Sequence, residues 1–130
     1  MTTSTRQAHR SDWRWVLAAA ALISAAAHVP VIGPHLQEAP YMGTLFVLLT
    51  LSCVALAVAA VVNDSVVVYA LSIATCGLAV IGYCATRLVA FPQLGDDVGS
   101  WFEPLGVVSV LAESMAVLGA VNGLRDRAGD

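Results

Sequence analysis

Charge is what this sequence has least of. Only 12% of its 130 residues are Asp, Glu, Lys or Arg, and lysine is absent. An average soluble domain carries about 25% charged residues. Hydrophobic residues make up 58% of the chain, which excludes an ordinary water-exposed surface. The composition therefore predicts a protein that lies in lipid, and the length allows a single domain.

Two other scarcities narrow the possible functions. The net charge is −3 and the six basic residues form no cluster with aromatic residues, so nucleic-acid binding is excluded. The three cysteines, Cys53, Cys76 and Cys84, lie in apolar runs without a CxxC spacing. They predict neither a disulfide framework nor a zinc knuckle, and ordinary packing is favoured over binding of Cu(I).

What the chain does have is four long apolar runs, at residues 15–33, 42–62, 66–89 and 101–123. Each is close to the roughly 20 residues that a helix needs to cross a bilayer. Buried strands are the competing interpretation, but backbone groups in lipid must be hydrogen-bonded within their own segment, which selects helices. We therefore expect an all-α fold, a membrane-spanning up-down four-helix bundle over residues 15–123, with tails at residues 1–14 and 124–130.

The first run also resembles a cleaved signal peptide, because it has a basic start and ends near three alanines at positions 25–27. Its apolar stretch is longer than a usual signal core, and His28 and Pro30 follow without a mature polar domain. A retained transmembrane helix is the favoured interpretation.

The arginines predict the orientation. Five of the six, Arg6, Arg10, Arg14, Arg125 and Arg127, flank the first and last runs. With four crossings both tails lie on one side, and the positive-inside rule makes that side the cytoplasm of a bacterial inner membrane. The short turn at residues 63–65 would also be cytoplasmic and makes its two helices antiparallel neighbours. Residues 34–41 and 90–100 are then the outer loops.

Small and polar residues recur at helical spacing within the runs. In the third run Tyr69, Ser72, Cys76, Tyr83 and Arg87 share one face, and the other runs carry similar stripes. Such stripes mark the packed sides of membrane helices, because close approach and interhelical hydrogen bonds drive association there. We expect these faces to point inward.

Glu113 is the most informative single residue. It lies twelve residues beyond Trp101, about 18 Å along the helix, and thus near the middle of the bilayer. A carboxylate at that depth is costly and usually serves a pathway or a partner. The alternative is a protonated side chain that only hydrogen-bonds a neighbouring helix.

His28, His35 and Glu38 place two imidazoles and a carboxylate around the end of the first run. These ligand types suit Zn²⁺ or another divalent metal ion, although the spacing matches no established metal motif. The alternative is a polar outer loop, with His28 as a hydrogen-bonded core residue.

Arg87 admits three interpretations. It extends to the membrane interface, it pairs with Glu103, Asp96 or Asp97 and holds the outer loop on the bundle, or it clamps an anionic ligand.

Two stretches carry a resemblance to a family. They are residues 35–46, which begin His35-Leu36-Gln37-Glu38, and residues 87–113, which include Trp101-Phe102-Glu103-Pro104 and Glu113. Together they resemble uncharacterised small four-helix integral membrane proteins of high-GC bacteria. The resemblance implies a fold and a compartment and no activity. The small lycopene cyclases, of similar size, are rejected because their acidic Pro-Glu-Glu motif is missing.

Our leading hypothesis is a membrane protein that binds a small ligand or metal ion in an outward-facing cavity. The ligand-binding residues would be His28, Glu38, Tyr83, Arg87, Glu103 and Glu113, and the metal ligands His28, His35 and Glu38. Besides the lipid bilayer, a second copy or a membrane-complex partner is expected. The alternatives are an accessory subunit of a larger membrane complex, and a membrane-embedded enzyme that uses Glu113 and His28 as acid and base on a lipid-like substrate.

Overall fold

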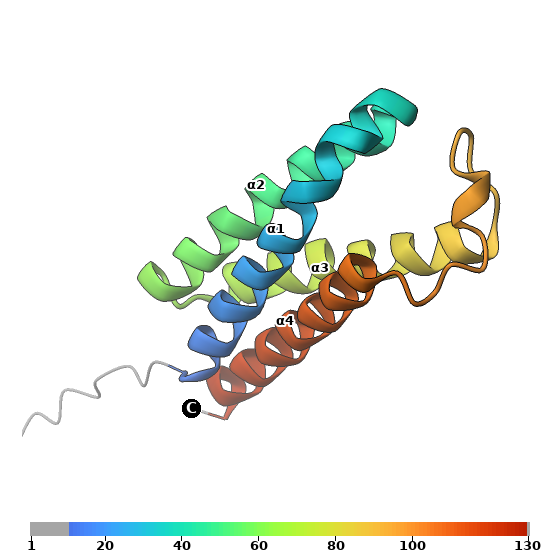
Figure 1. Ribbon diagram of the computed structural model, residues 1–130. Helices are drawn as coiled ribbons and strands as arrows, with labels where there is room; N and C mark the ends of the chain where they lie inside the picture. Colours follow the sequence, from blue (N-terminus) through green and yellow to red (C-terminus); the bar gives the residue numbers. More distant parts are fainter. Residues whose placement is uncertain (1–10, 130) are drawn as a thin grey trace, which may run out of the picture.

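The structure, a computed structural model, describes residues 11–129. Its four long helices are α1 (Trp13–Glu38), α2 (Pro40–Val62), α3 (Val66–Leu88) and α4 (Pro104–Ala128), and a short 3₁₀ helix, η1 (Gly95–Asp97), lies between α3 and α4 (Figure 1). No strand occurs in this part of the chain. Each long helix has 23 to 26 residues and is apolar enough to cross a bilayer. The predicted all-α, membrane-spanning bundle is confirmed, and the protein is a multi-pass integral membrane protein.

The helices run alternately in opposite directions and pack in the order α1–α2–α3–α4 around the bundle (Figure 1). The turn at residues 63–65 makes α2 and α3 antiparallel, as predicted, and Ser65 caps α3 by accepting a hydrogen bond from the Val68 N–H at 3.3 Å. Contact between α2 and α3 is the least extensive of the four neighbouring pairs. These two helices diverge as they leave the turn, which leaves room inside the other end of the bundle.

Two names for the ends of the bundle are used below. The tail end holds the 63–65 turn, the start of α1 and the end of α4. The loop end holds the junction of α1 with α2 and the α3–α4 loop, residues 89–103 (Figure 1). Arg6 and Arg10, which contribute to the predicted orientation, lie outside the described residues.

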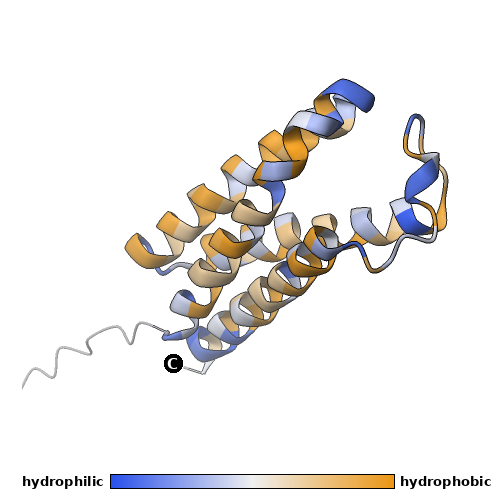
Figure 2. Ribbon diagram, in the orientation of Figure 1, coloured by the Kyte–Doolittle hydropathy of each residue, from blue (hydrophilic) through white to orange (hydrophobic). Residues whose placement is uncertain are grey.

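Small residues fill the interior, and large aliphatic residues cover the outside. Tyr69 and Leu17 are the largest apolar-bodied side chains that are fully buried, among alanines such as Ala116 and Ala120. By contrast Leu48, Leu51 and Leu118 are more than half exposed. The hydropathy colouring shows apolar residues along the outer faces and polar ones concentrated toward both ends (Figure 2). An apolar outer surface of this kind is in contact with the lipid bilayer.

Glycine lets α1 and α2 approach closely at the loop end. A Cβ atom on Gly43 would lie 2.6 Å from the backbone nitrogen of Leu36, closer than real atoms pack. Gly119 on α4 has a similar position against the backbone of Leu17, where a Cβ atom would lie at 3.2 Å. This is the use of small residues that the predicted stripes implied.

The predicted outer loop at residues 34–41 is wrong. Helix α1 continues through Pro30 and Pro34 to Glu38, and only Ala39 separates it from α2. The Ala39 N–H donates to the His35 carbonyl at 2.8 Å, so the connection is a tight corner rather than a loop. Each proline removes one backbone donor, a loss that membrane helices tolerate.

At the other loop and at the tail end the boundaries also shift. Helix α4 begins at Pro104 instead of residue 101, because Trp101 and Phe102 belong to the α3–α4 loop. Its last turn includes Arg125 and Arg127, so most of the predicted tail at residues 124–130 is helical.

Asp64 joins the elements at the tail end. Its carboxylate accepts hydrogen bonds from the Ser11 N–H at 3.0 Å and from the Tyr69 hydroxyl, and it lies 3.6 Å from Nε of Arg127. The Ser11 hydroxyl also donates to Asp126 at 2.7 Å. The carboxylate is buried and holds α1, α3 and α4 together at the tail end. The divergence of α2 and α3 opens the opposite end of the bundle.

Candidate functional site

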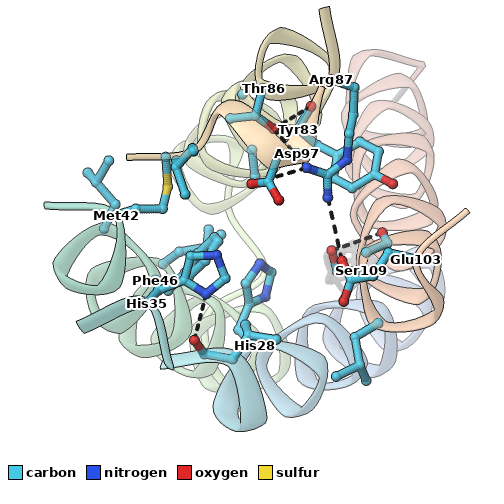
Figure 3. A pocket seen from close by; sticks show the side chains of 18 of the residues that line it. His28, His35, Met42, Phe46, Tyr83, Thr86, Arg87, Asp97, Glu103 and Ser109 are labelled. Carbon is cyan, nitrogen blue, oxygen red and sulfur yellow. Dashed lines mark hydrogen bonds and ion pairs between the residues drawn. The ribbon is translucent and has the colours of Figure 1, made fainter. Parts of the chain in front are cut away.

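A cavity of about 530 Å³ occupies the loop-end half of the bundle. All four helices and the α3–α4 loop line it (Figure 3). It exists because α2 and α3 diverge from the 63–65 turn and are not brought together again by large side chains. Its walls are apolar in the middle and polar at both ends.

Glu113, which is 1% exposed, and His28 line the deep end of the cavity, and the buried Ser24 lies behind them. The Ser24 hydroxyl donates to Oε1 of Glu113 at 3.0 Å, and Nε2 of His28 lies 3.6 Å from the same oxygen. No hydrogen bond to the other oxygen, Oε2, is seen among the described residues. The three groups come from α1 and α4 and form one buried polar cluster, with the thiol of Cys53 3.9 Å from the Ser24 hydroxyl.

The ring of His28 has a defined orientation. Its Nδ1 lies 2.7 Å from the Ser24 carbonyl, one helical turn earlier. A carbonyl only accepts, so Nδ1 carries a hydrogen and Nε2 of the neutral ring is an acceptor that faces Glu113. One proton can therefore reside on Glu113 or on Nε2, which gives either a neutral pair or an ion pair.

Two histidines share one aromatic neighbour on α2. The ring centroid of Phe46 lies 5.2 Å from that of His28 and 4.8 Å from that of His35. Nδ1 of His35 lies 2.8 Å from the Val31 carbonyl, so it is also bonded to its own helix. Phe46 separates the deep cluster from the loop end and supplies part of the apolar wall (Figure 3).

Arg87 dominates the loop end of the cavity and is only 6% exposed. Its NH1 lies 3.3 Å from Asp97 and its NH2 lies 3.5 Å from Glu103, while the guanidinium carbon lies 4.4 Å from the centre of the Tyr83 ring. His28 and Arg87 point into the cavity from opposite sides (Figure 3). Of the three interpretations of Arg87, the pairing that holds the loop on the bundle matches the structure, with Asp97 and Glu103 as partners.

Three further hydrogen bonds hold the α3–α4 loop over the cavity. The Gly99 N–H donates to the Arg87 carbonyl at 2.9 Å, and the Tyr83 hydroxyl donates to the Trp101 carbonyl at 2.8 Å. The Tyr41 hydroxyl, at the start of α2, donates to the Pro92 carbonyl at 2.6 Å. Gly99 has a positive φ of 80°, a conformation that glycine adopts without strain. The loop therefore forms a partial cover anchored on α2 and α3.

The structure brings every residue of the predicted ligand set to this cavity. His28 and Glu113 form its deep end, Tyr83, Arg87 and Glu103 its loop end, and the exposed Glu38 lies at the rim. His35 also lines it. Depth along each helix, counted at about 1.5 Å per residue, was enough to place these residues in the same half of the bundle.

The predicted metal set is not assembled. No group of three or more His, Cys, Asp or Glu side chains in residues 11–129 is placed to hold a metal ion. His28 and His35 are two helical turns apart, roughly 10 Å along α1, and each bonds a carbonyl of its own helix through Nδ1. Because His28 lies against Glu113, it does not join His35 and Glu38 in a metal site.

Several residues of the site were missed from the sequence. Ser24 was assigned only to the packed face of its helix, although its place one turn before His28 is a usable signal. Phe46 and Ser109 line the cavity but were not predicted as site residues, and Asp97 was predicted only as a possible partner of Arg87.

Comparisons of the chain with protein-family models, with curated proteins and with solved structures found no match. The cavity and its residues are therefore the features that indicate a function.

Proposed function

We propose that this membrane protein binds a small amphipathic organic molecule in the loop-end cavity. One observation supports the proposal above all: ten ionisable or aromatic residues from the four helices and the α3–α4 loop converge on a single space of about 530 Å³. Ligand pockets have volumes of about 300–1,000 Å³ and combine apolar walls with a few convergent polar groups.

The lining suits an elongated ligand with a polar group at its deep end. The apolar side chains between the two polar ends are Val31, Leu45, Phe46, Leu49, Leu78, Ala79 and Leu105. They would contact the hydrocarbon part of the ligand, and Glu113 with His28 would contact its polar group. A buried ionisable pair that only packed helices together would not need a cavity beside it.

The cavity would open on the side of the membrane away from the cytoplasm. Arg14, Arg125 and Arg127 lie at the tail end, and the positive-inside rule favours the cytoplasm for that end in a bacterial inner membrane. Because the chain is small, a second copy or a membrane-complex partner is an added part of this proposal. A purely accessory role in such a complex stays a hypothesis based on size alone.

Ligand-induced stabilisation tests the proposal. Protein in lipid nanodiscs would be unfolded thermally, with tryptophan fluorescence as the signal, in the presence of neutral, cationic and anionic aromatic amphiphiles. A ligand present at 100 times its Kd stabilises the folded state by about 2.7 kcal/mol, so at least one compound should raise the Tm.

The control is a variant with a filled cavity, Ala79→Phe, which should lose the shift. No shift with any compound, or equal shifts in both proteins, would contradict ligand binding in the cavity.

The distance of 3.6 Å between Nε2 of His28 and Oε1 of Glu113 also favours a second candidate function. A carboxyl and an imidazole that share a proton beside an apolar cavity are the two groups that acid–base catalysis on a lipid-like substrate needs. Incubation of the purified protein with bacterial lipid extract, followed by mass spectrometry, tests this. A product formed by the wild type and absent with His28→Gln would support catalysis, and an unchanged extract would count against it.

A further inference from the structure

The charges around the cavity indicate which class of molecule it accepts. Resting on the ligand-binding role proposed above, we infer that the ligand is a small amphipathic cation whose positive group lies against Glu113. Four observations lead to this inference: the balance of charge, the pairing of Arg87, the free oxygen of Glu113 and the apolar walls.

Carboxylates outnumber fixed cations in the lining. A single arginine faces five acidic residues, and the two histidines are the other titratable bases; the acids are Glu38, Asp96, Asp97, Glu103 and Glu113. A cleft lined mainly by one sign of charge focuses its field and concentrates ligands of the opposite sign. The cavity therefore attracts cations to its mouth and repels anions.

Arg87, the one fixed cation, is already occupied. Its NH1 and NH2 groups lie 3.3 Å from Asp97 and 3.5 Å from Glu103, so two carboxylates surround one guanidinium. The third nitrogen, Nε, is buried and has no hydrogen-bond partner among the described residues. An anionic ligand that bound NH1 or NH2 would have to displace Asp97 or Glu103. The guanidinium thus holds the loop and is not open to an anion.

Glu113 at the deep end differs from Arg87, because one of its carboxylate oxygens is not paired in residues 11–129. Ser24 donates to Oε1, whereas no partner of Oε2 is seen among the described residues, and Glu113 lines the cavity. The nearby ring nitrogen of His28, Nε2, is an acceptor when the ring is neutral. A buried carboxylate needs a partner of opposite charge. A ligand ammonium or phosphonium group would supply that charge.

The apolar walls of the cavity indicate that the cation is amphipathic. Phe46, Leu49, Leu78 and Ala79 lie between the deep cluster and Arg87 and offer no polar groups to a hydrated ion. An inorganic cation would also lack a cluster of ligands, because no group of three suitable side chains is placed to hold a metal ion in residues 11–129. An organic cation with aromatic or alkyl groups matches both the walls and the carboxylate.

A pair of probes with the same shape and opposite charge tests the inference. Tetraphenylphosphonium and tetraphenylborate each carry four phenyl groups around one charged centre. Binding to protein in phosphatidylcholine nanodiscs would be measured by equilibrium dialysis, with subtraction of the uptake by empty nanodiscs, because lipid takes up the two ions unequally. We expect saturable binding of tetraphenylphosphonium and none of tetraphenylborate.

Variants locate the binding to the deep end. Glu113→Gln keeps the shape of the side chain and removes its charge, and should weaken tetraphenylphosphonium binding at least about tenfold, which corresponds to about 1.4 kcal/mol. Glu113→Asp keeps the charge and should retain most of the binding. Asp12→Asn is the matched control, since Asp12 is exposed at the tail end outside the cavity, and should bind like the wild type.

Each outcome separates the inference from the proposed function. Binding of tetraphenylborate or of neutral triphenylphosphine oxide in preference to the cation would overturn the cationic class and leave ligand binding standing. Equal affinity of the wild type and a folded Glu113→Gln for the cation would also overturn it. If Glu113→Gln fails to fold, cation binding retained by Glu113→Asp and not competed by the neutral probe supports the inference, and competition by the neutral probe contradicts it. Absence of binding by all three probes would contradict both proposals.

Discussion

At the scale of single residues, the deep cluster shows how a membrane helix accommodates a carboxyl group. Glu113 is buried, and its Oε1 accepts from the Ser24 hydroxyl while His28 stands on the same side. His28 itself is oriented by the Ser24 carbonyl. Ser24 therefore contacts both ionisable groups, once through its side chain and once through its backbone.

Replacement of Ser24 should show how much this donor contributes. Ser24→Ala removes the hydroxyl that donates to Glu113 and leaves a buried acceptor short of a partner, which costs about 1–3 kcal/mol. Thermal unfolding in nanodiscs should show a lowered Tm. Ser52→Ala on α2 is the control, because this half-buried residue does not line the cavity and removal of its hydroxyl should change the Tm little. Equal Tm values for both variants would argue against a structural hydrogen bond at Ser24.

At the scale of elements, Arg87 connects a helix to a loop. Its side chain pairs with Asp97 and Glu103, and its carbonyl accepts from the Gly99 N–H at 2.9 Å. Both kinds of contact hold the α3–α4 loop against the end of α3. Arg87 thus contacts the loop through both its side chain and its backbone, in addition to the contacts made by Tyr83 and Tyr41.

Arg87→Gln should therefore release the loop without unfolding the bundle. Loss of the guanidinium leaves the two carboxylates without their partner, and the amides of residues 89–103 should exchange hydrogen faster. Hydrogen exchange followed by mass spectrometry measures this, with Arg125→Gln, an exposed arginine at the tail end, as the control. Unchanged exchange in the loop of Arg87→Gln would mean that Tyr41, Tyr83 and the backbone bonds suffice to hold it.

The corner between α1 and α2 depends on close packing of helices. At Gly43 an added Cβ atom would lie 2.6 Å from the Leu36 nitrogen, whereas at Gly77 on α3 it would meet nothing within 4 Å. Gly43→Ala should lower stability by about 1–3 kcal/mol through overpacking. Gly77→Ala should be neutral or slightly stabilising, since alanine is favoured over glycine within helices by roughly 1 kcal/mol. Tm measurements that rank the two variants in the reverse order would show that α1 and α2 move apart at the corner with little loss of stability.

At the scale of the whole molecule, the two ends of the bundle differ in construction. The tail end is closed by the buried Asp64 with Ser11, Tyr69 and Arg127. The loop end is open inside and is covered by a loop attached through Arg87 and Tyr41. A bundle that is tight at one end and hollow at the other has a single entrance side.

The proposed orientation in the membrane rests on the arginines at the tail end. With both chain ends in the cytoplasm, a periplasm-active phosphatase fused after residue 130 should be inactive, and the same reporter inserted in the α3–α4 loop at residue 96 should be active. A fluorescent protein that matures only in the cytoplasm should give the reverse pattern. Activity of the phosphatase at the C-terminus would reverse the proposed orientation and put the cavity mouth in the cytoplasm.

Features set by local sequence were predicted, whereas features set by contacts between distant residues were not. Stripes such as Tyr69, Ser72 and Cys76 predicted the inward faces, and all three side chains are buried. The predicted end of the first apolar run at residue 33 is wrong, because the helix passes through both Pro30 and Pro34 although each proline lacks a backbone donor. The choice of Asp97 over Asp96 as the partner of Arg87 was not predictable, since it depends on the path of the α3–α4 loop.

The four membrane-spanning helices, their alternating direction and the shared half of the bundle for His28, Arg87 and Glu113 were predictable from the order of residues. These properties follow from apolar length, turn length and counting along a helix, which are all local. Only the tertiary structure decided that Ser24 and Glu113, 89 residues apart, meet at 3.0 Å, and that a cavity rather than packed side chains lies beside them. The rotation of each helix and the divergence of α2 from α3 set those outcomes, and both depend on contacts summed along every pair of helices.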